Sequence, residues 1–311
     1  MSRSEKIAFL CLLCLYCLWG STFLGIRFAV QTVPPFIVGV IRHGFGGLAL
    51  VTFLVAGRNR KAFGSRTQIF NALKMGLITA GISNAALAWA GTHVPSGISA
   101  VAFATMPLFL VLLNWALFAK VSPSLTDWIA ISLGLSGSII VPFVSTSLSG
   151  HPLSWFDLAM LALAPSAWAV GSLYGKRVAM PPNILASAAL QMLSGAFIQS
   201  LAAAVHGDWT TFSIHQVSTP SLLGVLYLAV GGSLAGYTCF ATAIRSLDPR
   251  IVSTYAFMNP VIALTLGVIW GERLLTPSIM LGSILSVGGV AVMLLGSLRN
   301  ARLAKSRAAV A

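Results

Sequence analysis

Arg42 and His43 are adjacent ionisable residues in the middle of a long apolar stretch. A charged side chain at the centre of a bilayer costs about 3 kcal/mol or more, so Arg42 is expected to face the protein interior. There its guanidinium would bind an anionic group of a small molecule, such as a carboxylate, with His43 beside it and Arg27 as a second cation. Alternatively, Arg42 packs against backbone carbonyls, and Arg27 extends from its helix end to the interface. The sequence leaves both interpretations open.

Aromatic and amide side chains recur near the centres of the apolar stretches. Trp and Tyr usually gather at the membrane interfaces, so this placement predicts a cavity for an apolar or aromatic metabolite. Packing between helices is the alternative for each of them. Together with Arg42 and His43, the predicted substrate-binding residues are Trp19, Asn84, Trp89, Trp168, Tyr237, Tyr255 and Asn259.

The acidic residues number six, and all of them lie in loops or at the ends of apolar stretches. A proton relay through a membrane carboxylate is therefore disfavoured. Neither HExxH nor GxSxG occurs, so no catalytic residue is predicted. Cys11, Cys14 and Cys17 are spaced like metal ligands but lack a fourth ligand nearby, and we expect small packing residues without metal or cofactor. The sequence GGSLAG at 231–236 lacks the strand and helix of a nucleotide site, so no nucleotide is expected either.

Pro107 and Pro260 occupy corresponding places in two apolar stretches. A proline inside a helix removes one backbone hydrogen bond and permits a kink. We predict helix kinks at both prolines, where they would form part of a cavity wall.

Membrane helices must position all these residues. Of 311 residues, 57% are hydrophobic and only 8% are charged, against about a quarter charged in soluble proteins. The apolar stretches are each near the ~20 residues that cross a bilayer as a helix. The fold class predicted is an all-α polytopic membrane protein with ten transmembrane helices. The expected spans are Ala8–Val30, Phe36–Gly57, Ala72–Thr92, Ser96–Phe118, Trp128–Val144, Trp155–Gly175, Ile184–Val205, Pro220–Ile244, Ile251–Trp270 and Thr276–Leu298.

The basic residues fix the expected orientation. With the N-terminus in the cytoplasm, 16 of the 19 Lys and Arg residues fall in cytoplasmic segments, and only Arg273 falls outside. Arg27 and Arg42 lie within spans. This asymmetry follows the positive-inside rule. We therefore expect the chain to lie in the inner (plasma) membrane of the cell, with both termini in the cytoplasm. The net charge of +13 is thereby explained without a nucleic-acid partner.

The two halves of the chain match each other. Trp19 aligns with Trp168 at an offset of 149 residues, and Pro107 aligns with Pro260 at an offset of 153. Five spans per half is an odd number, so the second copy must be inverted across the membrane. Inverted repeats of this kind are typical of secondary transporters.

Three segments carry a resemblance to a known family: LYCLWGSTFLGIRFAV, ISAVAFATMPLFLVLL and YAFMNPVIALTLGVIWGERLL. They resemble the EamA-type branch of the drug/metabolite transporter superfamily. The resemblance implies two EamA-like five-helix repeats, at 8–144 and 155–298, around a central cavity. Residues 299–311 would form a short basic cytoplasmic tail. First-half copies in this family often end their fourth span with Glu, where this chain has Ala119 and Lys120.

These observations predict a secondary transporter, not an enzyme, that moves small organic metabolites by alternating access between the repeats. The resemblance implies amino acids or related compounds as substrates and export as the direction. The alternative is an intramembrane lipid-modifying enzyme, which would need reactive groups converging at one depth. The expected partners are a small-molecule substrate and the lipid bilayer, and a homo-oligomer is left open.

Overall fold

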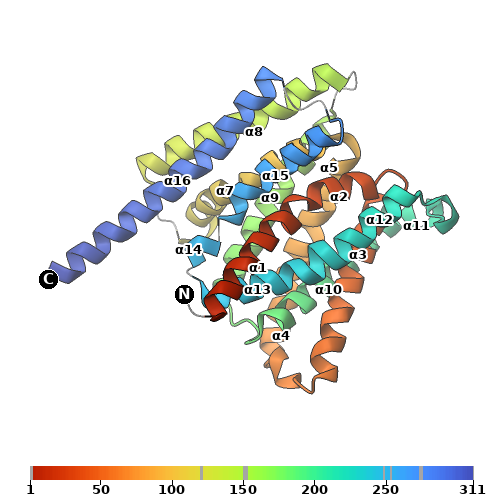
Figure 1. Ribbon diagram of the computed structural model, residues 1–311, viewed down its shortest axis with the longest axis horizontal. Helices are drawn as coiled ribbons and strands as arrows, with labels where there is room; N and C mark the ends of the chain where they lie inside the picture. Colours follow the sequence, from red (N-terminus) through yellow and green to blue (C-terminus); the bar gives the residue numbers. More distant parts are fainter. Residues whose placement is uncertain are drawn as a thin grey trace.

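The computed structural model describes residues 3–119, 122–149, 153–247, 249–252, 254–272 and 276–310, and all secondary structure in these ranges is helical (Figure 1). The side chains of residues 119, 142–149, 249, 250, 257, 294 and 297–310 lie outside this description. Short turns connect the helices. The chain therefore forms the all-helical bundle that its composition predicts.

The first half of the chain runs from α1 to α8. Its helices are α1 (Arg3–Gly20), α2 (Thr22–Ala29), α3 (Pro35–Ala56), η1 (Arg60–Phe63), α4 (Arg66–Gly76), η2 (Leu77–Ser83), α5 (Asn84–His93), α6 (Ser96–Ala104), α7 (Met106–Leu113), η3 (Asn114–Ala119) and α8 (Leu125–Ser149).

The second half runs from α9 to α16. Its helices are α9 (Trp155–Gly175), α10 (Ile184–His206), α11 (Asp208–Thr211), η4 (Ile214–Gln216), α12 (Thr219–Tyr227), η5 (Leu228–Ala235), α13 (Gly236–Ser246), α14 (Pro249–Val252), α15 (Tyr255–Ile269) and α16 (Pro277–Val310). The helix α16 continues through the expected tail.

Six helices in the described residues are long and apolar enough to cross a membrane. The other four expected spans fall on α4–η2–α5, α8, α15 and α16, and the last three of these contain shorter apolar helices. The six long helices are Arg3–Ala29, Pro35–Ala56, Ser96–Phe118, Trp155–Gly175, Ile184–His206 and Thr219–Ser246.

The halves pack against each other reciprocally. Corresponding helices form pairs: α3 packs on α10, α6 on α15, and α8 on α16. The first helix of each half also crosses to the other half, because α1 contacts α13 and α15, while α9 contacts η2–α5 and α6–α7. Exchanging the halves thus reproduces the contact pattern, as expected for two copies of one unit.

Small residues allow the close contact between α8 and α16, which lie side by side in Figure 1. A β-carbon added at Gly137 would lie 2.3 Å from the carbonyl oxygen of Gly282, and one added at Gly289 would lie 2.5 Å from the Gly134 nitrogen. Helices in lipid associate through such small residues because lipid offers no hydrophobic driving force between them.

The third helix of each half contains a π-helical segment. These are η2 and η5, which occupy corresponding places in α4–η2–α5 and α12–η5–α13. A π-helical turn disturbs the regular backbone hydrogen bonds and frequently lies at a functional site. Both segments flank the cavity described below.

The prolines have different local effects. The helix α6 ends at Ala104 and α7 begins at Met106, so the helix is interrupted at Thr105, two residues before Pro107. Pro260 lies inside α15, which continues past it. A third proline, Pro165, lies buried inside α9 and was not among the expected kink positions.

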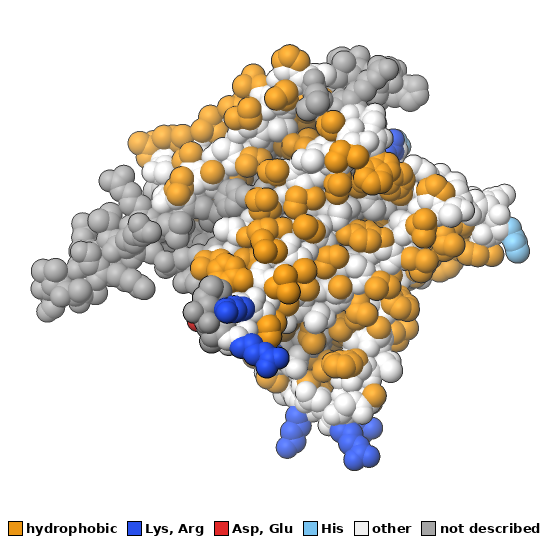
Figure 2. Space-filling model, viewed as in Figure 1, with side chains coloured by type: hydrophobic (Ala, Val, Ile, Leu, Met, Phe, Trp, Pro, Cys, Tyr) orange, Lys and Arg blue, Asp and Glu red, His pale blue; other side chains and the backbone are white. Residues whose placement is uncertain are grey.

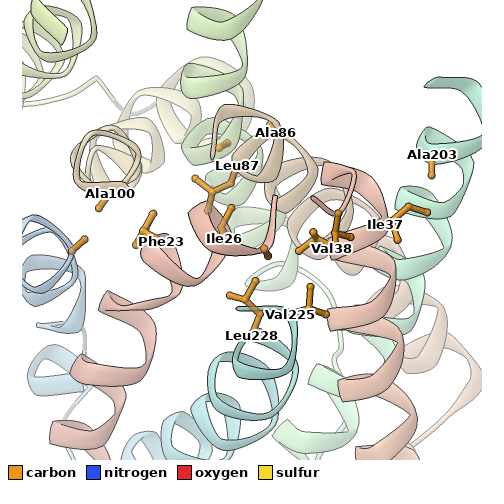
Figure 3. Close-up of a cluster of buried hydrophobic side chains, with 14 residues drawn as sticks. Phe23, Ile26, Ile37, Val38, Ala86, Leu87, Ala100, Ala203, Val225 and Leu228 are labelled. Atoms are coloured by element: carbon orange, nitrogen blue, oxygen red, sulfur yellow. The ribbon is translucent and has the colours of Figure 1, made fainter. Parts of the chain in front are cut away.

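Apolar side chains around α2 form the largest buried cluster, shown in Figure 3. Phe23 and Ile26 of α2 meet Leu87 of α5, Val38 of α3 and Leu228 at the start of η5. Each such buried side chain contributes about 1.5–3 kcal/mol relative to exposure. This cluster joins both halves next to the polar cavity.

On the face shown in Figure 2, most Lys and Arg side chains lie at one end of the molecule. In Figure 2, Lys and Arg side chains gather near the start of α1 and at the connection between α3 and α4, while hydrophobic side chains dominate the middle of the face shown. We refer to this end as the basic end and to the opposite end, where α10 passes into α11, as the far end. An uncharged middle between polar ends is the surface that a bilayer requires.

Candidate functional site

A central cavity of about 60 Å³ lies between the halves. That volume accommodates a few water molecules. Eight of the nine predicted substrate-binding residues line it, and Trp89 does not. The lining residues are Trp19, Thr22, Phe23, Arg42, His43, Asn84, Leu87, Phe103, Trp168, Tyr237, Tyr255 and Asn259.

Arg42 is buried, with 9% of its surface exposed, and it lines the cavity from α3. Its Nε donates a hydrogen bond of 3.1 Å to Ser233 Oγ of η5. A guanidinium carries five N–H donors, and within the described part of the chain this is its one hydrogen bond. The terminal nitrogens are therefore available to a ligand.

Gln199 holds His43 in place beside Arg42. Gln199 Nε2 donates to Ala80 O of η2 at 2.8 Å and lies 2.9 Å from His43 Nδ1, which is also 3.1 Å from Gly39 O. With Nδ1 occupied, Nε2 is the ring nitrogen left to face the cavity. Gly39 makes this arrangement possible, because a β-carbon there would lie 1.5 Å from Gln199 Oε1.

Trp19 forms an aromatic wall of the cavity with residues of the second half. Its indole Nε1 donates to Gly232 O at 3.1 Å, a bond between α1 and η5. Its ring centroid lies 4.9 Å from that of Tyr255 and 5.5 Å from that of Tyr237, both in edge-to-face geometry. Trp168, the counterpart of Trp19, lies 5.8 Å from Phe103. An aromatic wall of this kind binds apolar or aromatic groups.

Two amides supply uncharged polar atoms. Asn84 Nδ2 donates to Thr79 O at 3.0 Å, which leaves its oxygen free for the cavity. Asn259 is 9% exposed, and its buried Oδ1 has no hydrogen-bond partner among the described residues. A buried acceptor without a donor costs about 1–3 kcal/mol, which a ligand N–H or O–H group would recover only if the amide turned its oxygen towards the cavity.

Sequence comparison gives these features a family context. The chain matches the EamA-like transporter family over residues 6–143 and again over 155–295. The chain belongs to the EamA-like transporter family. Its match in two copies coincides with the two reciprocal halves of the fold.

Several relatives of this EamA-like protein are known by name. The uncharacterized inner membrane transporter YedA of Escherichia coli (strain K12) is 35% identical over 85% of this chain and 83% of its own. Protein PecM of Dickeya dadantii (strain 3937) is 24% identical over 86% and 85%. A Salmonella typhimurium protein named "Probable amino-acid metabolite efflux pump" is 23% identical over 94% and 96%. A crystal structure with 18% sequence identity superposes with a TM-score of 0.61 over 95% of this chain and 98% of the other, which shows the fold alone.

A second cavity of the EamA-like bundle, which we name the vestibule, lies beside the central cavity and has a volume of about 480 Å³. Trp19, Trp168, Tyr237 and Tyr255 line both cavities and separate them. The vestibule extends towards Lys176 and the connection between α9 and α10 at the basic end. A solute from that end would pass these four aromatic rings to reach Arg42.

Trp89 lies in a different group at the far end, which we name the outer cluster. Its Nε1 donates to Asp157 Oδ1 at 3.1 Å, and His93 Nδ1 lies 3.1 Å from the same oxygen. Its ring packs edge-on against His206, whose Nδ1 is 2.6 Å from Asp208 Oδ1. Here the aromatic rings close around paired charges.

Two further contacts at the far end hold helix termini. Glu272 accepts hydrogen bonds of 2.9 Å from the Ser96 nitrogen and 2.8 Å from Ser96 Oγ, which caps α6. Arg27 donates at 3.1 Å to the carbonyls of Gly91 and Thr92 at the end of α5. Arg27 therefore binds backbone and is not part of the cavity.

Sequence reasoning missed Ser233, Gln199 and the π-helical segments η2 and η5 as parts of the site. Ser and Gln are common enough in membrane helices that they gave no signal by themselves. The glycine pair Gly231–Gly232 entered the sequence analysis only as part of GGSLAG, which lacks the setting of a nucleotide site. Its position within η5, beside Trp19 and Arg42, is a consequence of tertiary packing.

Proposed function

We propose that this protein is a secondary transporter of small organic metabolites that carry a carboxylate, namely amino acids or related compounds. The observation that carries the proposal is the buried guanidinium of Arg42, which faces a cavity between two repeats and keeps most of its donors free. A bidentate contact with a carboxylate suits those donors. The aromatic wall would contain the rest of the solute.

The proposed topology has ten transmembrane helices in two inverted five-helix repeats. Both termini lie in the cytoplasm and the basic end faces it, in the inner membrane. Alternating access arises when the halves rock about the central cavity. The vestibule at the basic end supports a cytoplasm-facing conformation, from which an exporter would load its substrate. The kinks expected at Pro107 and Pro260 would provide bending points, and neither nucleotide nor nucleic acid takes part.

The first experiment measures solute movement in proteoliposomes with a labelled panel of carboxylic and amino acids. The expected result is saturable movement of at least one member, recovered chemically unchanged by mass spectrometry, above that of protein-free liposomes. A modified product instead of a translocated solute would favour the intramembrane enzyme. If neither movement nor product is found across the panel, the proposal fails.

The topology has its own test. Cysteines introduced at Ser2 and Ala311, in a background without the four native cysteines, should react with an impermeant reagent only after the cytoplasmic face is exposed. Labelling of the two positions from opposite sides would contradict the inverted repeat.

A further inference from the structure

The path from the vestibule to the central cavity carries basic groups without acidic ones. Lys176 lies at the mouth of the vestibule and Arg42 lines the central cavity. No Asp or Glu is among the described residues that line either cavity. The field along this path is therefore positive, which attracts anions and repels cations.

Arg42 lacks a carboxylate partner inside the protein. Both ion pairs in the described part of the chain are His–Asp pairs of the outer cluster. A buried guanidinium that bonds one serine hydroxyl is solvated incompletely, and an anionic ligand would supply the missing charge.

We propose that the transported species has a net negative charge: a small aromatic carboxylate with an uncharged N–H or O–H donor and without an ammonium group. This inference rests on the proposed function and narrows it from amino acids and related compounds to carboxylates that lack an ammonium group. The carboxylate binds Arg42 in the central cavity, and the ring packs against Trp19 and Tyr255, which line both this cavity and the larger vestibule. Rotation of the Asn259 amide would bring its oxygen to the uncharged donor.

An ammonium group finds no compensating charge on this path. The amide oxygens of Asn84 and Asn259 can accept a hydrogen bond from it but do not offset its charge, and Arg42 repels it. Burial of an unpaired charge is far more costly than burial of a hydroxyl that is hydrogen-bonded. The site thus discriminates against both amines and zwitterions.

A net charge on the solute also supplies a driving force. An inside-negative membrane potential favours the outward distribution of a monoanion by a factor of ten for every ~59 mV. Export would then need no carboxylate relay, in agreement with the absence of acidic side chains from the described residues lining both cavities.

The test uses three compounds that share a phenol ring: 3-(4-hydroxyphenyl)propanoate, tyrosine and tyramine. The propanoate carries only the carboxylate, tyrosine carries both the carboxylate and an ammonium group, and tyramine carries only the ammonium group. Each is loaded with radiolabel into proteoliposomes at pH 7.5, and a potassium gradient with valinomycin sets the potential. Protein-free liposomes are subtracted, and 2-(4-hydroxyphenyl)ethanesulfonate serves as an anion that does not cross lipid by itself.

The expected result is efflux of the propanoate and the sulfonate at least about tenfold faster than that of tyrosine, with no protein-dependent efflux of tyramine. An inside-negative potential of ~59 mV should shift the final distribution of either anion about tenfold outward. Arg42→Gln should remove both effects, whereas Arg27→Gln should retain them.

Other outcomes overturn the inference. Movement of tyrosine or tyramine as fast as the propanoate, or a distribution that ignores the potential, would show that net charge is not selected, while the transporter itself would stand. The four compounds could all fail while a member of the wider panel of carboxylic and amino acids is transported. A transported member that is neutral or cationic would then overturn the inference, and a transported anion would support it. Failure of every compound would refute the proposed function as well.

Discussion

The central cavity and the outer cluster contain the same kinds of side chain, yet the charged and polar groups of these side chains have different partners in the two places. Each combines tryptophan with ionisable groups. In the outer cluster, Asp157 accepts hydrogen bonds from Trp89 and Ser154 and lies against His93. In the cavity, Arg42 bonds only Ser233 within the described structure, and Asn259 Oδ1 bonds nothing there. Each carboxylate of the outer cluster lies against a histidine, although Asp208 Oδ2 has no hydrogen-bond partner among the described residues, whereas Arg42 has no oppositely charged side chain against it there. This difference separates a structural cluster from a binding site.

The largest contrast is expected between the two membrane arginines. Arg42→Gln should reduce the kcat/KM for transport of a carboxylate substrate by at least about 30-fold, because the buried charge of the substrate loses its partner. Arg27→Gln should change it less than about threefold, since Arg27 bonds only the carbonyls at the end of α5. Initial rates in proteoliposomes measure both. Equal losses in the two variants, at equal folded yield, would remove the distinction drawn for Arg42.

The two tryptophans should separate transport from stability. Trp19→Phe removes the hydrogen bond to Gly232 O and should slow transport about fivefold. Trp89→Phe removes a donor to Asp157 and should lower the melting temperature by about 2–4 °C while transport stays within twofold. Transport assays and thermal unfolding in detergent measure each variant. Slower transport by Trp89→Phe than by Trp19→Phe would reverse the assignment of the two regions.

The smallest effects concern two buried amides. Asn259→Leu should slow transport about twofold and leave the melting temperature unchanged or raised, because its oxygen has no hydrogen bond to lose. Gln199→Leu removes bonds to Ala80 O and His43 and should lower the melting temperature by about 2–4 °C. A marked loss of stability in Asn259→Leu would mean that this amide is structural.

Much of the cavity could be predicted from residue type and repeat position. Arg42 is expected in the interior because lipid excludes its charge, and Trp19 and Trp168, which align with each other, are both expected to line a cavity. These inferences need only the membrane environment and internal symmetry. Both tryptophans and Arg42 line the central cavity.

Other features depend on rotation and packing that the sequence does not encode locally. Trp89 lies one turn from the end of α5, and only the fold brings Asp157 within reach of it. Arg27 and Arg42 both lie within apolar stretches, so the sequence around them does not reveal their partners. Arg27 bonds Gly91, which is 64 positions away, and Arg42 bonds Ser233, which is 191 positions away. The helix is interrupted before Pro107 but continues through Pro260, so residue type and repeat position alone do not predict the local effect of a proline.

The most direct measurement of the central claim is protection of a cavity residue by the transported solute. Asn84→Cys, in a background without native cysteines, places a thiol in the cavity wall, and His93→Cys places one in the outer cluster. A saturating concentration of transported solute should slow labelling of Asn84→Cys by a small thiol reagent at least about tenfold and leave His93→Cys unchanged. Unchanged labelling of Asn84→Cys, in a variant that still transports the solute, would contradict the assignment of the cavity as the substrate site.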